Sequence, residues 1–317
     1  MRARIPWWRH RRVLPWLIQA AAALLVLLAI SALISNLVVN LSAAGLLLSW
    51  QWLGTPAGFD LGETLLPFGA GEPYWMALLS GLVNSLRVIV AALVGATTLG
   101  TAVGLASFSR NALLRSLARV YVELIRNCPL LMQLLFWYFV VFLGLPDGAS
   151  ALHLPGLVLA KSGLHLGPAE LVDGVWRAPI RLSLEFTALL CALVVYSGAF
   201  IAEVVRGGVQ AVPPGQWEAA RSLGLRPRQI LGRIVLPQAL RVIVPGLNNQ
   251  YIALAKNSSL AVAVGYGDLY SVAETTLNQT GRAIEVVLIL LGSYLLIDLA
   301  ISALMNGLNR LVQLNER

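Results

Sequence analysis

Apolar residues run along this chain in stretches that are too long for the buried helices of a soluble domain. A helix that crosses the hydrocarbon layer of a bilayer needs about 20 predominantly apolar residues. The sequence has six stretches of that kind, separated by polar or Pro- and Gly-rich segments. We predict membrane-spanning helices at Leu14–Val39, Leu82–Phe108, Tyr121–Leu145, Leu182–Val205, Leu240–Val264 and Val286–Leu308.

The composition supports this interpretation. Of the 317 residues, 58% are hydrophobic and only 12% are charged, which is far from the balance of a soluble globular protein. The fold class that follows is an all-α membrane protein with six transmembrane helices. The two cysteines, Cys128 and Cys191, lie far apart in apolar surroundings, so they indicate neither a disulfide framework nor a metal site.

The first apolar stretch follows five arginines, as the start of a secretory signal would. A signal has an apolar region of about 7 to 15 residues before its cleavage site, and Leu14–Val39 is longer. We therefore favour a retained signal-anchor helix, with a cleaved signal as the alternative.

The basic residues predict the orientation of the helices. If both termini are cytoplasmic, 16 of the 23 lysines and arginines fall on the inner side, as the positive-inside rule requires. The Pro- and Gly-rich stretches Gly54–Pro73 and Pro146–Pro179 then become periplasmic loops. The predicted location is the bacterial inner membrane, with an anchor helix and periplasmic segment at 1–80, a five-helix core at 81–310 and a cytoplasmic tail at 311–317.

Glycines recur at helical spacing in the second stretch. Gly95, Gly100 and Gly104 would leave one helix face without bulk, which lets a neighbouring helix approach closely. The alternative is that glycine is simply frequent in membrane helices.

One inner loop, at 206–238, has a pattern suited to docking. Pro213 and Pro214 favour the start of a helix, and Gly224 favours its end in the left-handed conformation. A second short helix is predicted at Arg226–Leu236, ended by Pro237. By itself, such an amphipathic element fits docking to another protein or lying on the membrane surface.

The spacing within this loop resembles a known signature. Seven positions match the EAA motif of importer permeases of the ATP-binding-cassette (ABC) class, and they are Glu218, Ala219, Ala220, Gly224, Ile234, Leu236 and Pro237. In that family the motif forms a coupling helix seated on the ATPase subunit. The resemblance implies a type I importer core of five helices, preceded here by one extra N-terminal helix.

Three further segments resemble the polar amino-acid branch of that family: Asn84–Val90, Tyr121–Leu134 and Gly198–Val209. Asn249–Leu269 and Thr276–Glu285 are most similar to a permease subunit of general L-amino-acid transporters. Two positions differ from the branch, since Gly267 replaces a proline and Gln250 replaces a common glutamate.

The resemblance also implies the partners. They are a cassette ATPase dimer, a second permease that is either a relative or a second copy, a periplasmic amino-acid-binding protein, L-amino-acid cargo and the bilayer, with no nucleic acid. The chain has no GxxxxGK[ST] sequence, so ATP and Mg²⁺ are expected on the partner ATPase and no cofactor or metal on this chain.

Polar residues at bilayer depth are costly and mark candidate functional positions. For the cargo path these are Asn249, Gln250, Lys256, Asn257 and Ser258. The alternative is that they only bond neighbouring helices. Arg126 and Glu203 are candidates for a gate or for an ion pair with each other.

Two other classes of membrane protein predict features that this sequence lacks. A secondary carrier predicts inverted repeats or paired broken helices, and neither is visible in the sequence. A membrane enzyme needs a nucleophile, a base and an orienting group that converge, but His10, His153 and His165 all lie in terminal or outer segments. The predicted function is therefore an importer permease subunit that carries out no catalysis itself.

Overall fold

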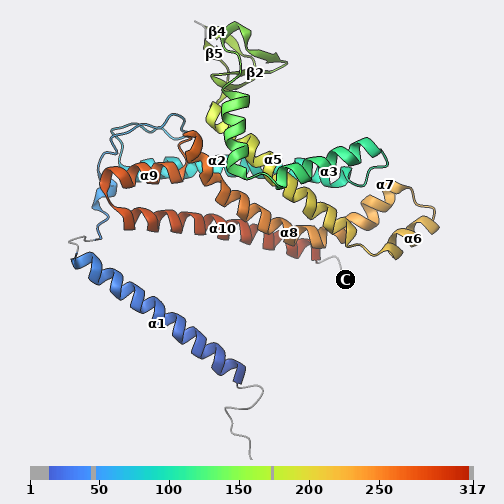
Figure 1. Ribbon diagram of the computed structural model, residues 1–317, viewed down its shortest axis with the longest axis horizontal. Coiled ribbons are helices and arrows are strands. Elements are labelled where there is room, and N and C mark those ends of the chain that lie inside the picture. The colour runs from blue at the N-terminus through green and yellow to red at the C-terminus, as the bar shows by residue number, and fades with distance from the viewer. Residues whose placement is uncertain (1–13, 44–47, 173–174, 314–317) are drawn as a thin grey trace, which may run out of the picture. The chain divides into compact units, whose positions relative to one another are not determined.

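A computed structural model describes residues 14–43, 48–172 and 175–313, which are mostly helical (Figure 1). The N-terminal arginines, Asp173 and Arg317 lie outside the described residues. The chain forms two compact units, Met1–Trp50 and Gln51–Arg317. Each unit is considered by itself.

The first unit contains one long helix. α1 spans Leu14–Ala43 and carries no charged residue. Its apolar side chains are exposed around the whole helix, including Leu25, Leu27 and Leu33. A helix that is apolar on all sides is typical of a membrane span, and its 30 residues extend about 45 Å.

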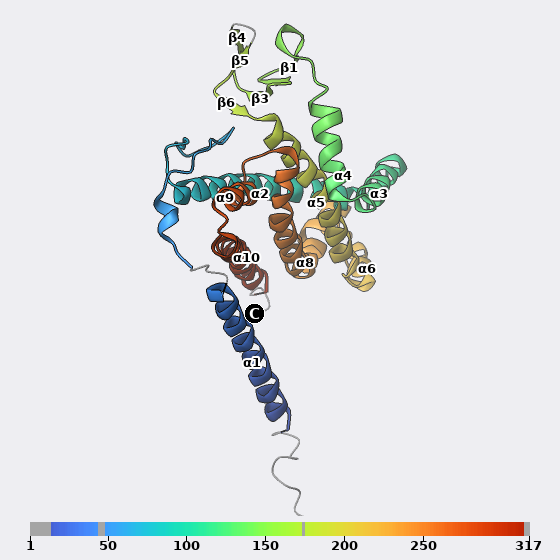
Figure 2. The ribbon, with the colours of Figure 1, turned by 60° about the vertical axis from the view of Figure 1, so that its left-hand side comes forward.

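Four helices of the second unit match the predicted spans. They are α2 (Tyr74–Ala106), α5 (Leu184–Gln210), α8 (Leu236–Asn257) with its 3₁₀ extension Ser258–Val264, and α10 (Ala283–Gln313). α8 and α10 lie side by side (Figure 2). Among the described residues, five helices are long and apolar enough to cross a membrane, and a bent pair gives a sixth candidate.

That bent pair corrects the predicted span Tyr121–Leu145. α3 (Ala112–Arg126) ends before Pro129, and the chain turns by 106° into α4 (Leu130–Leu135) and the π-helical turn Phe136–Phe142. Proline lacks an N–H group and disfavours helical geometry in the residue before it, so the helix breaks at Asn127–Pro129. α3 is amphipathic, with apolar side chains such as Leu113 and Leu117 exposed on one face.

The glycines of α2 are packed against α5, as their spacing predicts. A Cβ atom on Gly100 would lie 2.6 Å from Ile201, and one on Gly104 would lie 2.8 Å from the carbonyl oxygen of Ala202. Both distances are too short for a methyl group. Within the described part of the chain, α2 packs more extensively against α5 than against any other element.

The outer segment after the π-helical turn contains strands that the sequence analysis did not predict. β1 (Leu152–Leu154), β2 (Leu157–Ala160), β3 (Gly163–Leu166) and β6 (Ile180–Leu182) form an antiparallel sheet in that order, and β4 (Glu170–Val172) pairs with β5 (Val175–Arg177). Val158, Ala160 and Trp176 form a small core. Since α5 starts just after β6, the sheets and the inner loop 206–238 lie at opposite ends of α5 (Figure 1).

Residues 51–73, at the start of the second unit, lie at the same end of α5 as the strands, because Glu63 contacts Ser183 just before α5. Trp52, in the 3₁₀ turn Gln51–Gly54, packs edge-on against Tyr74 with ring centroids 5.5 Å apart. Leu269 and Val272 of α9 (Leu269–Thr280) complete this apolar cluster. Residues 51–73 are therefore packed on α2 and α9.

Candidate functional site

The inner loop folds as a short helix that starts and ends where the sequence predicts. α6 spans Pro214–Ser222, with Pro213 as its N-cap residue and Pro214 in its first turn. Gly224 follows with φ +73°, the left-handed geometry that favours glycine. α6 is therefore defined at both ends by residues of the loop itself.

Most of α6 faces away from the rest of the chain. Only Ala220 is buried, at 1% exposure, while Leu223 just after the helix is 78% exposed. Glu218 and Ala219 are also exposed. Glu218 forms no ion pair with Arg221 within the described residues, although the two are three positions apart. α6 and the residue after it therefore leave the Glu218 carboxylate and the apolar Leu223 side chain exposed and available to a partner protein.

The helix that follows differs from the prediction. α7 (Pro227–Ile230) continues through a π-helical turn, Leu231–Val235, into α8 without a break. Pro237 does not end this helix but lies in the first turn of α8. Because a proline is tolerated in a first turn and the wider π-turn precedes it, the missing N–H interrupts little. Ile234, Leu236 and Pro237 thus join the loop rigidly to the span.

The cargo-path candidates fall on two faces of α8 and its extension. Asn249 and Lys256 are exposed on the same side as Pro245, whereas Gln250 and Asn257 are half-buried. Ser258 points inward and donates to the carbonyl oxygen of Ala255 at 2.8 Å. An exposed amide in the middle of a span would be costly against lipid, so this face requires protein or water.

Lys256 has a partner that the sequence analysis did not assign. Its ammonium lies 3.3 Å from the carboxylate of Asp298 in α10. The Asp298 side chain is 18% exposed and the Lys256 side chain is 61% exposed, so a lysine at the surface supplies the counter-charge of a largely buried carboxylate.

Arg126 and Glu203 come together, as the ion-pair interpretation predicts. A guanidinium nitrogen of Arg126 lies 3.7 Å from Glu203, and Arg206 binds the same carboxylate at 2.7 Å. The Arg126 guanidinium also stacks 5.2 Å from the ring centre of Phe200. Glu203 is thus shared between two helices.

These charged groups line a cavity of about 700 Å³ between α2, α3 and α5. Arg115 and Arg119 add two further cations on the α3 side, and Glu123 adds one carboxylate. The lining therefore carries an excess of positive charge, which favours anionic groups.

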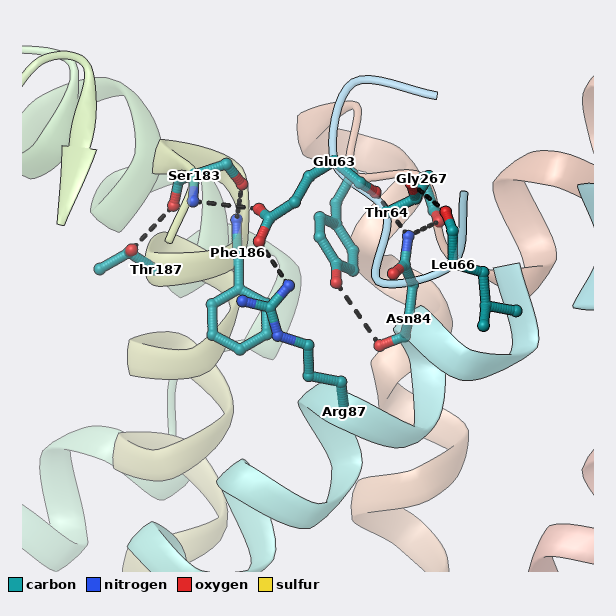
Figure 3. A network of polar contacts seen from close by, with 10 residues as sticks. Glu63, Thr64, Leu66, Asn84, Arg87, Ser183, Phe186, Thr187 and Gly267 are labelled. Carbon is teal, nitrogen blue, oxygen red and sulfur yellow. Dashed lines mark hydrogen bonds and ion pairs between the residues drawn. The ribbon is translucent and has the colours of Figure 1, made fainter. Parts of the chain in front are cut away.

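At the opposite end of α5, a polar network holds four segments together, and the sequence analysis missed it (Figure 3). The Glu63 carboxylate accepts from the Ser183 N–H at 3.0 Å and pairs with Arg87 of α2. Both side chains of the ion pair are only 18% exposed. The Arg87 guanidinium lies 4.3 Å over the ring of Phe186.

An amide completes this network. The Asn84 side chain donates to the carbonyl oxygens of Glu63 at 2.8 Å and Gly267 at 2.9 Å. Segment 51–73 is therefore fixed to α2, to the first turn of α5 and to the start of α9. The sequence signal was the presence of polar Asn84 and charged Arg87 near the start of the predicted span Leu82–Phe108.

Burial changes the proton affinity of groups near this network. It raises the pKa of Asp268, the N-cap residue of α9, to about 7, although the Asp268 carboxylate accepts from the Ser271 N–H at 2.9 Å. Burial also raises the pKa of Tyr266. Asp268 is thus a carboxyl group that binds a proton near neutral pH.

Comparison with known proteins identifies the family of this chain. Residues 96–313 match the family model described as binding-protein-dependent transport system inner membrane component. The chain is 36% identical to the putative amino-acid ABC transporter permease protein YhdX of Escherichia coli (strain K12), over 95% of each chain. It is 34% identical to the general L-amino acid transport system permease protein AapQ of Rhizobium johnstonii, over 89% of this chain and 88% of that relative.

A solved structure extends the comparison to the fold. The crystal structure of an amino acid ABC transporter with histidines matches with a TM-score of 0.58 at 29% sequence identity. The match covers 94% of that chain but 75% of this one. The helical core is therefore shared, and this chain has additional segments.

Proposed function

Because the chain belongs to the family of binding-protein-dependent transport system inner membrane components, as a permease subunit of an amino-acid ABC importer, we propose that it moves L-amino acids from the periplasm to the cytoplasm. Transport is driven by a separate cassette ATPase that docks on α6. The observation that carries this proposal is the exposed α6, which bears the EAA positions Glu218 and Ala219.

The form of α6 suits the transmission of force. Its connection to α8 runs through α7 and the π-helical turn as a continuous helix from Pro227 to Val264. A displacement of α6 by the ATPase would therefore pass to the span through the short turn 223–226, in which the Leu225 N–H donates to the carbonyl oxygen of Ala220. In this proposal ATP and Mg²⁺ bind only to the ATPase.

The cargo path is proposed along the exposed face of α8. Asn249 lies on this face, and Gln250 adjoins it on the half-buried side. A second permease subunit, related to this chain or identical to it, would cover the same face and exclude lipid. Neutral amides donate to a cargo carboxylate and accept from a cargo ammonium, which suits polar amino acids of more than one charge type.

The orientation follows from the charges. The cavity with Arg126 and Arg206 and the loop with α6 would face the cytoplasm, and the strands and segment 51–73 would face the periplasm. Both termini would be cytoplasmic. A periplasmic amino-acid-binding protein would deliver the cargo to the periplasmic side, which carries the strands and segment 51–73.

The test is transport by the reconstituted complex. Proteoliposomes would contain this chain, its second permease and the ATPase, with the binding protein and labelled glutamine or glutamate on the periplasmic side. We expect accumulation that requires ATP hydrolysis and persists when ionophores remove ion gradients. Uptake that follows a proton or sodium gradient without ATP would contradict the proposal and favour a secondary carrier.

A further inference from the structure

A second, smaller cavity lies at the strand-bearing end of α5, beside the network of Figure 3. Its volume is about 330 Å³, at the lower end of the range for small-molecule sites. The cavity is polar, and its walls come from the inserted strands, from segment 51–73, from the first turn of α5 and from the turn before α9. The charged lining residues are Glu63, Lys161, Arg181 and Glu185.

The two signs of charge come from different parts of the chain. Lys161 lies in the turn between β2 and β3, and Arg181 lies in β6, so both cations belong to the inserted strands. The carboxylates belong to segment 51–73 and to the first turn of α5. The cavity thus has a basic side and an acidic side.

The charged side chains of the cavity also differ in how many hydrogen bonds and ion pairs they already form within the chain. Glu63 is occupied by Arg87 and the Ser183 N–H, so it forms part of a fixed wall. Among the described residues, Lys161 has no acidic partner within ion-pair distance. Arg181 donates to the carbonyl oxygen of Ser162 at 3.3 Å, which leaves other guanidinium N–H groups available.

Glu185 is the second available group. The Tyr138 hydroxyl donates to the Glu185 carboxylate at 3.5 Å, which is the limit of a hydrogen bond. Glu185 therefore retains most of its capacity to accept hydrogen bonds. A ligand in this cavity would meet two available cations on one side and one available carboxylate on the other.

We propose that this cavity binds a free zwitterionic α-amino acid, with its carboxylate at Lys161 and Arg181 and its ammonium at Glu185. The cavity is then a second amino-acid site, separate from the path along α8. A simple anion would leave Glu185 unpaired, and a simple cation would leave two basic groups unpaired. The proposal rests on the amino-acid importer function and adds a site on the permease itself.

The network of Figure 3 explains why such a site would be preorganised. Glu63 fixes the wall formed by segment 51–73 to α2 and to the start of α5. Asn84 fixes the same segment to Gly267, which also lines the cavity. A ligand would therefore meet three walls that are already held in place, which reduces the entropic cost of binding.

The experiment measures binding of labelled L-glutamine to the complete transporter in lipid nanodiscs without the binding protein. Two competitors each remove one charge: glutaramic acid lacks the α-ammonium, and 4-aminobutanamide lacks the α-carboxylate. We expect each to compete about tenfold more weakly than glutamine. Glu185→Gln should abolish the preference for glutamine over glutaramic acid, and Lys161→Ala with Arg181→Gln should abolish the preference over 4-aminobutanamide.

Arg177→Gln is the matched control, because Arg177 is an exposed arginine on β5 that does not line the cavity. It should preserve both preferences. The proposal is overturned if glutamine does not bind to the wild-type complex, or if the cavity variants retain both preferences, which would leave these charges with a structural role. ATP-driven uptake by the wild-type complex, measured separately with the binding protein, shows whether the importer function itself holds.

Discussion

The guanidinium of Arg126 lies 3.7 Å from the carboxylate of Glu203, and this contact joins the break after α3 to α5. Glu203 is also held by Arg206, one turn further along α5. Two helices with different directions therefore share one carboxylate at the wall of the larger cavity. If α3 moves relative to α5 during transport, the contact between Arg126 and Glu203 is one that the movement would change.

We predict that Arg126→Gln lowers uptake several-fold with little loss of stability. The pair is partly exposed, so its contribution to stability is expected to stay below about 1 kcal/mol. Uptake in proteoliposomes and the melting temperature of the purified complex are the measurements. Arg119→Gln, on the same helix but without an ion pair among the described residues, is the control. Unchanged uptake by Arg126→Gln would assign the pair a purely structural role.

The buried Asp268 predicts a dependence of stability on pH. Its folded-state pKa of about 7 lies above the ordinary value of 3.8, so between these values the folded state binds more protons than the unfolded state. The contribution of Asp268 to stability therefore falls as the pH rises from about 4 to 7, and stays constant above that range.

Asp268→Asn keeps a hydrogen-bond acceptor at the N-cap and removes the charge. We expect it to stabilise the complex at pH 8 by more than about 1 kcal/mol, the equivalent of one pKa unit. The gain should shrink at pH 5. Thermal unfolding of both proteins at the two pH values is the measurement. An equal effect at pH 5 and pH 8 would show that Asp268 is already ionised over this range.

The cargo path predicts a shift in selectivity. Gln250→Glu adds a negative charge beside the exposed face of α8, so it should favour basic over acidic cargo by up to about tenfold, or about 1.4 kcal/mol. The measurement is competition between labelled glutamate and arginine in the same cells. Gln313→Glu, at the exposed end of α10, is the control for an added charge away from the path. If Gln250→Glu and Asn249→Ala both leave rate and ranking unchanged at normal expression, these residues only bond neighbouring helices.

The spans could be predicted because each depends on local composition. α2, α5 and α10 follow directly from their apolar stretches, and α6 follows from Pro213, Pro214 and Gly224. The break before α4 also had a local signal, Pro129 itself, but the apolar residues on both sides favoured one continuous span in the prediction. The opposite error was made at Pro237, where the sequence predicted a helix end and the structure has a continuous helix. Pro237 is tolerated there because the π-helical turn before it places it in the first turn of α8.

The candidate site was only partly predictable, because its contacts join residues far apart in sequence. Lys256 pairs with Asp298 across 42 positions, and Glu63 contacts Ser183 across 120. No local pattern specifies such pairs. The strands after Pro146 were missed for a related reason: each has only three or four residues, so its alternation is too short to stand out from a Pro- and Gly-rich loop.

The docking of an ATPase on α6 is tested most directly by Glu218→Lys. This change reverses the charge on the exposed face of α6 without altering the buried Ala220. Glu170→Lys, the same exchange on exposed β4 at the other end of α5, is the matched control. Both variants should insert into the membrane as the wild type does.

The decisive measurement is ATP-dependent uptake of labelled amino acid by the Glu218→Lys complex, together with the amount of ATPase that co-purifies with it. We predict that uptake is lost and ATPase retention falls, while Glu170→Lys keeps both. Full uptake with normal ATPase retention by Glu218→Lys would contradict the assignment of α6 as the coupling helix.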